Sequence, residues 1–393
     1  MKNANIHTVI VTTLFCGTVL ALVYFAGPAF FITTYDARSE AVPQEDVSLQ
    51  EEAPKFVVRH ITTPHPLKAV YMTSWIAGTP KLREKIVKLI HETELNAIVI
   101  DIKDDTGRIS FPVTDPYLQK IGSSDPRIKD LEEFLDELHS KNIYVIGRVA
   151  VFQDPYLVRA RPDLAVRRKS DGGIWKDRKG LTWLDAGATE VWDYVVAIGK
   201  EAYSHGFDEI NYDYIRFPSD GDIADIAYTV SAGQKKSDVI KEFSAYLSLM
   251  TKPEIPVISA DLFGMTTSSQ SDMNIGQLLE NALPYFDYIA PMVYPSHYPS
   301  GFNGYKNPAT VPYEIVHYAM QSGVDRAELA STSPLKLRPW LQDFDLGADY
   351  TAEMVRAQIK ATYDVGLDSW MMWNASNVYT QGAYNTVDEI QNE

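Results

Sequence analysis

The sequence predicts an α/β protein whose main part is a (β/α)8 TIM barrel, preceded by an N-terminal transmembrane helix and a flexible linker. Three observations lead to this prediction. The chain begins with a long run free of charged residues, continues with an acidic stretch that has no periodicity, and then alternates eight short β-rich runs with helical patterns. Strands that alternate with helices form a parallel sheet, and eight of them close naturally into a barrel.

The first 34 residues are the predicted membrane anchor. Residues 6–32 contain no Asp, Glu, Lys or Arg, and about 20 apolar residues suffice to cross a bilayer as a helix. Lys2 is the only flanking positive charge on the inner side, and no convincing small-x-small cleavage site follows. We expect an uncleaved signal anchor in a single-pass protein of the cell membrane, with the later domain outside the cytoplasm. Secretion after signal cleavage is the alternative.

Residues 35–66 are predicted to form a linker. Acidic residues outnumber basic ones through Glu52, and no hydrophobic period is visible. Such a segment acts as a tether that lifts a folded domain off the membrane. The barrel domain then occupies residues 67–393.

Strands of the barrel are expected in eight apolar runs, at residues 68–75, 96–103, 143–152, 207–217, 256–264, 287–295, 337–344 and 368–376. Helical patterns lie between most of them, at residues 80–93, 125–142, 190–206, 236–250 and 352–366. Gly206 and Gly366 stand where a glycine commonly follows a helix. A doubly wound open sheet is the alternative fold, but no Gly-x-Gly-x-x-Gly follows the first strand, which disfavours a dinucleotide-binding version.

Polar residues collect near the C-terminal ends of these strands, where TIM-barrel enzymes place their active sites. The candidates in chain order are Asp101, Lys103, Arg148, Asn211, Asp213, Arg216, Asp261, Tyr294, Trp373 and Asn374. Because residues i and i+2 of a strand share a face, Asn211 and Asp213 point the same way, as do Asp101 and Lys103. For Asp101 and Lys103 the alternative is a purely structural ion pair.

Composition excludes several classes of partner and site. The formal net charge is -16, so nucleic acid and anionic lipid are poor candidates as partners. A single cysteine, Cys16, rules out an intrachain disulfide, and the eight histidines lack the spacing of a zinc motif. We expect no metal and no cofactor.

The order of several motifs resembles a known family. "KAVYMTSW", "NAIVIDIKDDTGRI", "GRVAVFQDPYL", "RRKSDGGIW", "TWLDAG" and "GFDEINYDYIRFP" follow one another along the chain. This order is similar to the glycoside hydrolase-like (β/α)8 barrel domain of bacterial membrane-anchored or secreted proteins, a domain of unknown function. The resemblance extends from Lys68 to about Asn385. It implies hydrolysis of a carbohydrate without fixing the substrate.

Two neighbouring barrel families bear on the catalytic residues. The α-amylase type has a nucleophilic aspartate at the end of the fourth strand, two residues after another pocket residue, and Asn211 and Asp213 resemble that placement. Its acid is a glutamate on strand five, where this chain has Asp261 instead. The chitinase type has a catalytic glutamate at the position of Ile215, so a mechanism that uses an N-acetyl group of the substrate is disfavoured.

Glycosidic hydrolysis needs one ionised and one protonated carboxyl group. Asp213 is the predicted nucleophile or base, and Asp261 is the predicted general acid. They lie on adjacent strands, and strands are about 4.8 Å apart, so both can flank one glycosidic bond. Arg148 is placed to keep Asp213 ionised. Asp101 is the alternative partner of Asp213.

The loop after strand three suggests a substrate class. Residues 154–184 hold eight Lys and Arg against four Asp, together with Trp175 and Trp183. Aromatic rings stack on sugars and basic groups pair with anions, so the predicted partner is a carbohydrate polymer and an acidic polysaccharide is a candidate. A solvated lid with internal salt bridges is the alternative for this loop. For the whole domain the alternatives are a non-catalytic glycan-binding barrel and a polysaccharide lyase.

Overall fold

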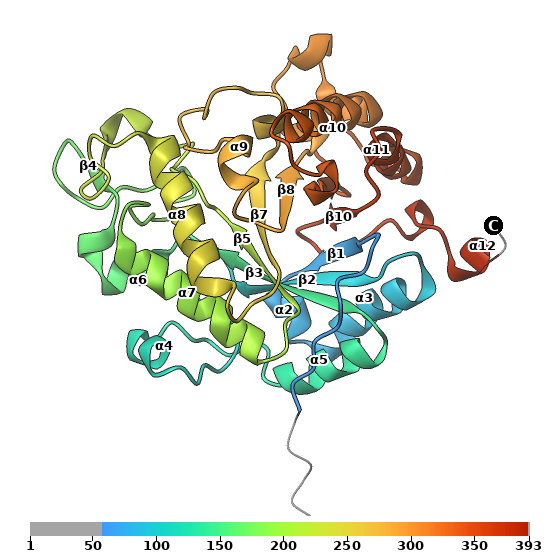
Figure 1. The fold of residues 1–393 in the computed structure, drawn as a ribbon, viewed down its shortest axis with the longest axis horizontal. Helices are drawn as coiled ribbons and strands as arrows, with labels where there is room; N and C mark the ends of the chain where they lie inside the picture. The colour runs from blue at the N-terminus through green and yellow to red at the C-terminus, as the bar shows by residue number, and fades with distance from the viewer. Residues whose placement is uncertain (1–56, 392–393) are drawn as a thin grey trace, which may run out of the picture. The chain divides into compact units, whose positions relative to one another are not determined.

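The computed structural model describes residues 57–391 and contains a closed barrel of eight parallel strands (Figure 1). Around the barrel the strands follow the order β1-β10-β9-β8-β7-β5-β3-β2. Each predicted apolar run contains one of them: β1 (Lys68–Met72), β2 (Ala97–Lys103), β3 (Tyr144–Ala150), β5 (Glu209–Asp213), β7 (Ile258–Phe263), β8 (Tyr288–Met292), β9 (Trp340–Gln342) and β10 (Trp370–Trp373). The predicted barrel is therefore confirmed, and the open sheet was the wrong alternative.

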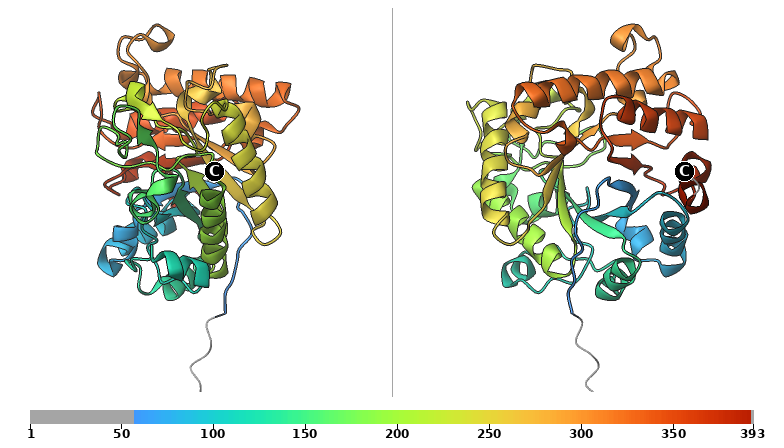
Figure 2. Two further views of the ribbon diagram at one scale, coloured as in Figure 1. Left: turned by 90° about the vertical axis from the view of Figure 1, so that its left-hand side faces the viewer. Right: turned by 45° about the vertical axis from the view of Figure 1, so that its right-hand side comes forward.

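Helices alternate with the strands and surround the barrel (Figures 1 and 2). Their bounds are α2 (Ser74–Ala77), α3 (Pro80–Glu92), α4 (Pro116–Ile121), α5 (Leu131–Ser140), α6 (Pro155–Ala160), α7 (Thr189–Ser204), α8 (Lys236–Thr251), α9 (Leu279–Ala282), α10 (Pro312–Leu329), α11 (Ala352–Asp364) and α12 (Val387–Gln391). Gly206 and Gly366 follow α7 and α11 with φ angles of 111° and 81°. Each helix thus ends two residues before the predicted glycine, which adopts the left-handed conformation typical of that position.

Helix α10 is absent from the helices predicted above. It buries Ile315, Ala319 and Met320 and lies beside α11 (Figures 1 and 2). The 3-10 turn η5 (Phe302–Gly304), which precedes it, projects from the body of the barrel in each view of Figure 2. The connection between β8 and β9 is therefore more elaborate than the sequence pattern indicates.

The register of the strands brings polar side chains together. Arg148 of β3 pairs with Asn211 of β5, and Asn211 pairs with Ser259 of β7. Asp213 and Asp261 each lie two residues further along their strands. They therefore project from the same face and at the same level, on adjacent strands at the C-terminal end of the barrel.

A long connection between β3 and α7 forms part of the barrel rim. It contains α6 and the short strand β4 (Arg167–Arg168), which pairs antiparallel with β6 (Ile226–Ala227) from the connection after β5. An antiparallel bridge joins Gln153 to Trp183. The segment thus returns to the end of the barrel and brings Trp183 to the site described below.

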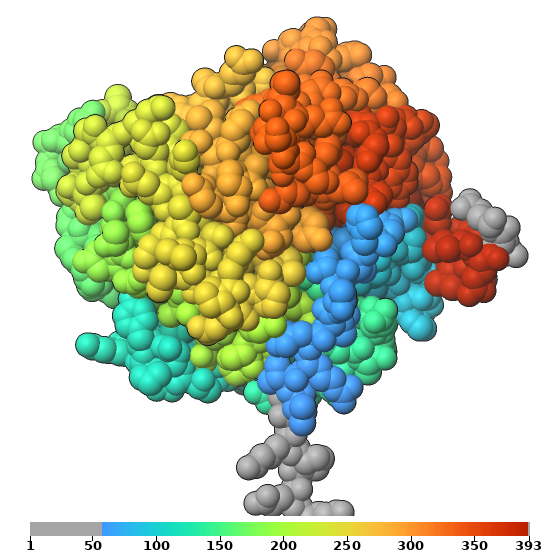
Figure 3. Space-filling view, in the orientation of Figure 1, coloured from blue at the N-terminus to red at the C-terminus, as the bar shows by residue number. Residues whose placement is uncertain are grey.

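Residues 57–66, which belong to the predicted linker, lie on the surface of the barrel (Figure 3). The backbone N–H of Ile61 donates a 2.7 Å hydrogen bond to Asp208, at the start of β5. The predicted anchor, residues 1–34, and most of the predicted linker lie outside the described residues. No helix between residues 57 and 391 combines the length and the apolar character that a membrane span requires.

Candidate active site

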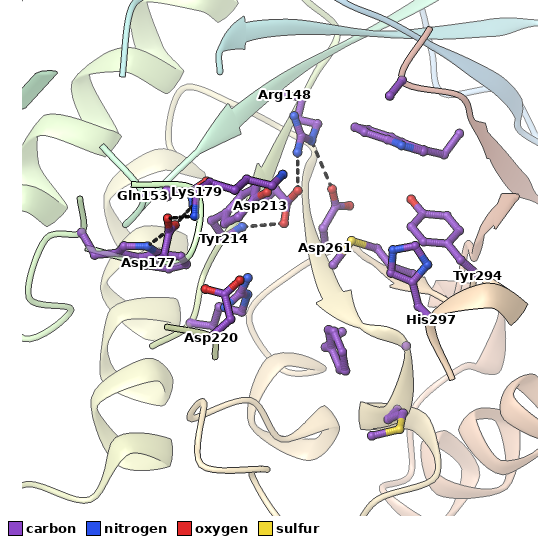
Figure 4. A pocket seen from close by; sticks show the side chains of 18 of the residues that line it. Arg148, Gln153, Asp177, Lys179, Asp213, Tyr214, Asp220, Asp261, Tyr294 and His297 are labelled. Atoms are coloured by element: carbon purple, nitrogen blue, oxygen red, sulfur yellow. Dashed lines mark hydrogen bonds and ion pairs between the residues drawn. The ribbon is translucent and has the colours of Figure 1, made fainter. Parts of the chain in front are cut away.

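Arg148 lies between three carboxyl groups at the C-terminal end of the barrel. Figure 4 shows two of them, Asp213 and Asp261. Its Nη1 donates a 2.6 Å hydrogen bond to Asp101, its Nη2 pairs with Asp213, and its Nε lies 3.6 Å from Asp261. Burial alone would lower the pKa of Arg148, but the carboxylates of Asp213 and Asp101 raise it well above its ordinary value. The guanidinium is therefore a fixed positive charge within the cluster.

Asp213 ends β5, and each of its oxygens has a partner. Oδ2 pairs with Arg148, and Oδ1 accepts a 2.5 Å hydrogen bond from the backbone N–H of Tyr214. Tyr214 has a φ of 55°, a left-handed conformation that costs a residue other than glycine roughly 1–3 kcal/mol. This turn places the carboxylate of Asp213 and the ring of Tyr214 at the same pocket.

Asp261 lies in the second half of β7, in a different environment. Its Oδ1 accepts hydrogen bonds from the Asn211 amide (2.9 Å) and from the Trp340 indole (2.8 Å). Burial and then the negative charge of Asp213 raise the pKa of Asp261 to about 8, although Arg148 and the two donors act in the opposite direction. Because Oδ1 already accepts two hydrogen bonds, Oδ2 is the oxygen that carries the proton. One carboxyl of the pair is thus protonated at neutral pH.

Asp101 supports Arg148 from the other side. Its Oδ2 accepts a hydrogen bond from the Tyr71 hydroxyl, and its Oδ1 accepts the bond from Arg148. Burial raises the pKa of Asp101, whereas Arg148 and Tyr71 act to lower it. The Tyr71 ring stacks on Trp373 with centroids 3.9 Å apart. Asp101 therefore holds the guanidinium in place and is itself held by an aromatic neighbour.

A cavity of about 450 Å³ opens onto this cluster, a size within the range of small-molecule sites in proteins. Its walls are formed by Arg148, Gln153, Asp177, Lys179, Trp183, Asp213, Tyr214, Arg216, Asp220, Asp261, Phe263, Gly264, Met265, Met292, Tyr294, His297, Tyr298, Trp373 and Ala375. Tyr294 and His297 lie beyond Asp261 as seen from Asp213 (Figure 4). Burial raises the pKa of Tyr294 and lowers that of His297, so the phenol keeps its proton and the imidazole is neutral at pH 7.

Two cations on another wall of the cavity lack carboxylate partners within the described part of the chain. The guanidinium of Arg216 lies 4.9 Å from the Trp183 ring centroid and 5.3 Å from that of Tyr214. Burial lowers the pKa of Arg216. Lys179 is exposed and has no ion-pair partner among residues 57–391. Arg216 also donates hydrogen bonds to the carbonyl oxygen of Phe217 (3.2 Å) and to the hydroxyl of Ser219 (3.0 Å). Neither cation is neutralised by an ion pair with another residue between 57 and 391.

Two further carboxylates also line the cavity. Asp177 accepts hydrogen bonds from the side chains of Gln153 (2.9 Å) and Trp183 (3.0 Å) and from two backbone N–H groups, so it holds the loop together. Asp220 has no hydrogen-bond partner among the described residues. Between residues 57 and 391, no three His, Cys, Asp or Glu side chains are grouped so that they could hold a metal ion.

Comparison with known proteins decides the family. Residues 69–379 match the family described as "Putative glycosyl hydrolase domain". The chain belongs to this glycosyl hydrolase domain family. The matched range includes Arg148, Asp213 and Asp261, and the family expected from the sequence motifs is confirmed. The search of curated proteins found no match to the chain.

Two solved structures with TM-scores above 0.5 share the fold of this glycosyl hydrolase domain. The glycoside hydrolase domain of PgaB (BpsB) from Bordetella bronchiseptica is 13% identical, covers 78% of this chain and 94% of its own, and gives a TM-score of 0.57. An α-L-fucosidase (isoenzyme 2) from Paenibacillus thiaminolyticus is 12% identical over 81% of this chain and 47% of its own, with a TM-score of 0.54. A hypothetical protein from Ruminiclostridium thermocellum is 38% identical over 49% of this chain and 96% of its own, with a TM-score of 0.45.

Most of the residues expected to form the site line the cavity of the glycosyl hydrolase domain. They are Arg148, Trp183, Asp213, Arg216, Asp261, Tyr294 and Trp373. Asp101 and Asn211, expected to bind substrate, do not line it. They contact Arg148 and Asp261 instead, and therefore position the charged groups that line the cavity.

The expectation that Lys103 binds substrate has to be corrected. Its side chain is 0% exposed, its ammonium lies 2.9 Å from Asp154, and it donates a 2.5 Å hydrogen bond to the carbonyl oxygen of Ala150. The pairing of β2 with β3 shifts register between Asp101 and Lys103. Such an irregularity breaks the alternation of a strand and redirects a side chain, which is why these two residues do not share a site.

Trp175 and Asn374 also lie outside the cavity lining. The indole of Trp175 is buried and donates a 2.8 Å hydrogen bond to the carbonyl oxygen of Asp222. The amide of Asn374 donates to the carbonyl oxygens of Asp343 and Val378. Both side chains stabilise rim loops, and neither was distinguishable from a sugar-binding residue by its sequence position alone.

Several lining residues were not identified from the sequence. Gln153, Asp177 and Lys179 come from the long connection after β3. Lys179 belongs to the basic run noted above, so the sequence contained a weak signal for it. Nothing in the sequence indicates that Asp177 and Gln153 face the barrel.

Proposed function

We propose that this domain is a glycoside hydrolase that acts on an extracellular or cell-envelope polysaccharide. The observation that carries the proposal is the pairing of two different carboxyls at one cavity, with Asp213 in contact with Arg148 and the pKa of Asp261 raised to about 8. Glycosidic hydrolysis requires this combination of an ionised and a protonated carboxyl. The family and the two glycoside hydrolases that share the barrel support the same reaction.

In the proposed reaction Asp261 is the general acid. The proton on its Oδ2 passes to the glycosidic oxygen as the bond to the anomeric carbon breaks, so the leaving sugar departs as an alcohol. Asn211 and Trp340 bind the other oxygen and fix the direction of the carboxyl. Positive charge develops on the sugar ring at the same time.

Asp213 faces that developing charge. In a retaining course its carboxylate attacks the anomeric carbon to form a glycosyl-enzyme, which a water deprotonated by Asp261 then hydrolyses. In an inverting course it removes a proton from the water that attacks the anomeric carbon. Arg148 and the Tyr214 N–H stabilise the negative charge before the reaction. Proton NMR shows which anomer of the new reducing end appears first, and this anomer distinguishes retention from inversion.

We further infer that the glycan carries anionic groups. Two arginines of the basic loop do not support this inference, because Arg161 pairs with Asp163 and Arg168 pairs with Asp171. Lys179 lines the cavity from that loop, and Arg216 lines it from the segment after β5. Cations without carboxylate partners favour uronate, phosphate or sulfate groups.

The cellular location remains a proposal drawn from residues 1–34. An uncleaved anchor would keep the barrel at the outer surface of the cell membrane, close to envelope polysaccharides. Mass spectrometry of the membrane-purified protein tests this proposal. A mature N-terminus near Phe30 would refute the anchor and favour secretion.

The function is tested by incubating the full-chain protein with alginate, hyaluronan, dextran, chitosan and peptidoglycan. The proposal expects new reducing ends from at least one polymer, without ultraviolet absorbance. An unsaturated product that absorbs in the ultraviolet would identify a lyase. Retention of a polymer without new reducing ends would identify a glycan-binding protein.

A further inference from the structure

Trp75 is an exposed aromatic residue on the catalytic side of the barrel. It lies in α2, directly after β1, and thus in a loop at the C-terminal end of a barrel strand. The residue is 63% exposed, more than any other aromatic residue between residues 57 and 391. A single exposed apolar residue is common on protein surfaces, so it is the surroundings of Trp75 at the rim of the barrel that indicate a role.

The ring of Trp75 is held from one side. The guanidinium of Arg127 lies 4.5 Å from the ring centroid. Arg127 is itself fixed, because it pairs with Asp104 and donates hydrogen bonds to the hydroxyls of Ser74 (2.8 Å) and Thr106 (3.1 Å). Its side chain is buried. One face of the indole is thereby supported by a rigid cation, and much of the ring remains open to solvent.

On one side, Trp75 is connected to the cavity through the end of β10. The backbone N–H and the hydroxyl of Thr73 donate hydrogen bonds of 2.9 Å and 3.0 Å to Asn377. Two residues before Asn377, Ala375 lines the cavity. The start of α2 therefore contacts the same rim segment that forms a wall of the candidate active site.

On the other side, the loop after β2 joins Trp75 to the cavity. Asp104 pairs with the arginine that supports Trp75. The next residue, Asp105, is exposed, and its negative charge is one of the causes that raise the pKa of Tyr214. Tyr214 lines the cavity beside Asp213. A short stretch of rim thus connects the exposed indole with the reactive carboxyls.

From this continuity we propose that Trp75 forms an outer sugar-binding platform. A pyranose ring of the same glycan chain stacks on its free face, while the scissile bond lies between Asp213 and Asp261. The inference rests on the proposed function, because it assigns a second contact to the polymer that occupies the cavity. It also implies that the enzyme binds an extended chain and not only a terminal sugar.

The first test compares substrate lengths. Oligosaccharides of increasing length, prepared from the polymer that the protein hydrolyses, are assayed with wild type, Trp75→Ala and Trp75→Phe. We expect the ratio of kcat/KM for long to short substrates to fall about tenfold in Trp75→Ala and less in Trp75→Phe, which keeps a ring. Tyr318→Ala is the matched control, because Tyr318 is an exposed aromatic residue of α10. An unchanged ratio in Trp75→Ala overturns the platform and leaves the hydrolase proposal intact.

A second test separates binding from hydrolysis. Affinity electrophoresis of the full-chain Asp213→Asn protein is run in gels containing each polymer of the panel, with and without Trp75→Ala. We expect at least one polymer to retard the protein, with a dissociation constant about tenfold higher when Trp75 is absent. Equal retardation overturns the platform, and the absence of any retardation overturns both proposals. Retardation that depends on Trp75, without hydrolysis by wild type, retains the platform and rejects the hydrolase.

Discussion

The Nε atom of Arg148 lies 3.6 Å from Asp261, although the same guanidinium pairs through Nη2 with Asp213. One cation therefore contacts both members of the proposed catalytic pair. Asp213 receives the direct ion pair, whereas Asp261 receives two neutral donors on its other oxygen. This asymmetry separates the roles of two chemically identical side chains.

The raised pKa of Asp261 predicts an alkaline limit to activity. With a pKa of about 8, the acid loses its proton as the pH rises through 8, so turnover of substrates with poor leaving groups should fall there. An aryl glycoside with an activated leaving group needs little protonation and should show a weaker limit. In Asp261→Asn the limit measured with that aryl substrate should disappear. If the activity of Asp261→Asn still falls at the same pH, the alkaline limit belongs to the titration of another group.

The same group predicts how stability depends on pH. The pKa of Asp261 is higher in the folded protein than its ordinary value of 3.8, so the folded state holds a proton that the unfolded chain releases. The free energy of unfolding should therefore fall as the pH rises from about 4 to about 8 and then level off, as far as this group is concerned. Urea unfolding at pH 5 and pH 8 measures the difference. Asp261→Asn should reduce it, and an unchanged difference would contradict the assignment.

Asp101 should act as a positioning residue. Asp101→Asn keeps the shape of the side chain but removes the charge that holds Arg148, so kcat should fall by about 100-fold. KM should change little, because Asp101 does not line the cavity. Tyr71→Phe, which removes only the hydrogen bond to Asp101, is the control and should have a smaller effect. A rise in KM with unchanged kcat would return Asp101 to a substrate-binding role.

Lys103 should matter for stability and not for catalysis. Lys103→Met leaves the fully buried carboxylate of Asp154 without its partner, a change that costs about 3–5 kcal/mol. Chemical denaturation measures this loss. The double variant Lys103→Met with Asp154→Leu should recover much of it, because both buried charges are then absent. If Lys103→Met is as stable as wild type but has a raised KM, Lys103 binds substrate instead.

The strands of the barrel and part of the candidate site could be predicted from the sequence. Parallel barrel strands are buried on both faces, so they appear as continuous apolar runs, and all eight could be located. The alternation of side chains then placed Asp213 and Asp261 on one face. The alternation of side chains failed to predict the position of Lys103 because the register shifts within β2. No local sequence pattern indicates that shift. Asp154, the partner of Lys103, comes from a loop whose path depends on tertiary contacts.

Rim residues were harder to predict for the same reason. Asp177 and Lys179 reach the cavity because the connection after β3 pairs with the segment after β5. Short strands of two residues carry no sequence period. Trp175 and Trp183 are eight residues apart in one basic loop, yet only Trp183 lines the cavity. Tertiary packing decides which of the two tryptophans faces the cavity, and the composition of the loop does not predict this choice.

Salt should weaken binding of an acidic glycan. The Debye screening length falls from about 8 Å at physiological ionic strength to about 3 Å at 1 M salt. The contributions of Lys179 and Arg216 to binding an acidic glycan should therefore decrease. KM for an acidic polymer should rise with salt in wild type and rise less steeply in Lys179→Ala. A neutral polymer serves as the control. Binding that is independent of salt, or a preference for the neutral polymer, would count against anionic groups.

Turnover of Asp213→Asn tests the central claim most directly. The substitution preserves volume, so circular dichroism and thermal unfolding should confirm a folded protein. On the polymer that wild type hydrolyses, the rate at which reducing ends appear should fall by about 10³-fold or more. Azide added to Asp213→Ala should restore turnover if this aspartate is the nucleophile. A folded Asp213→Asn protein with the turnover of wild type would contradict the account.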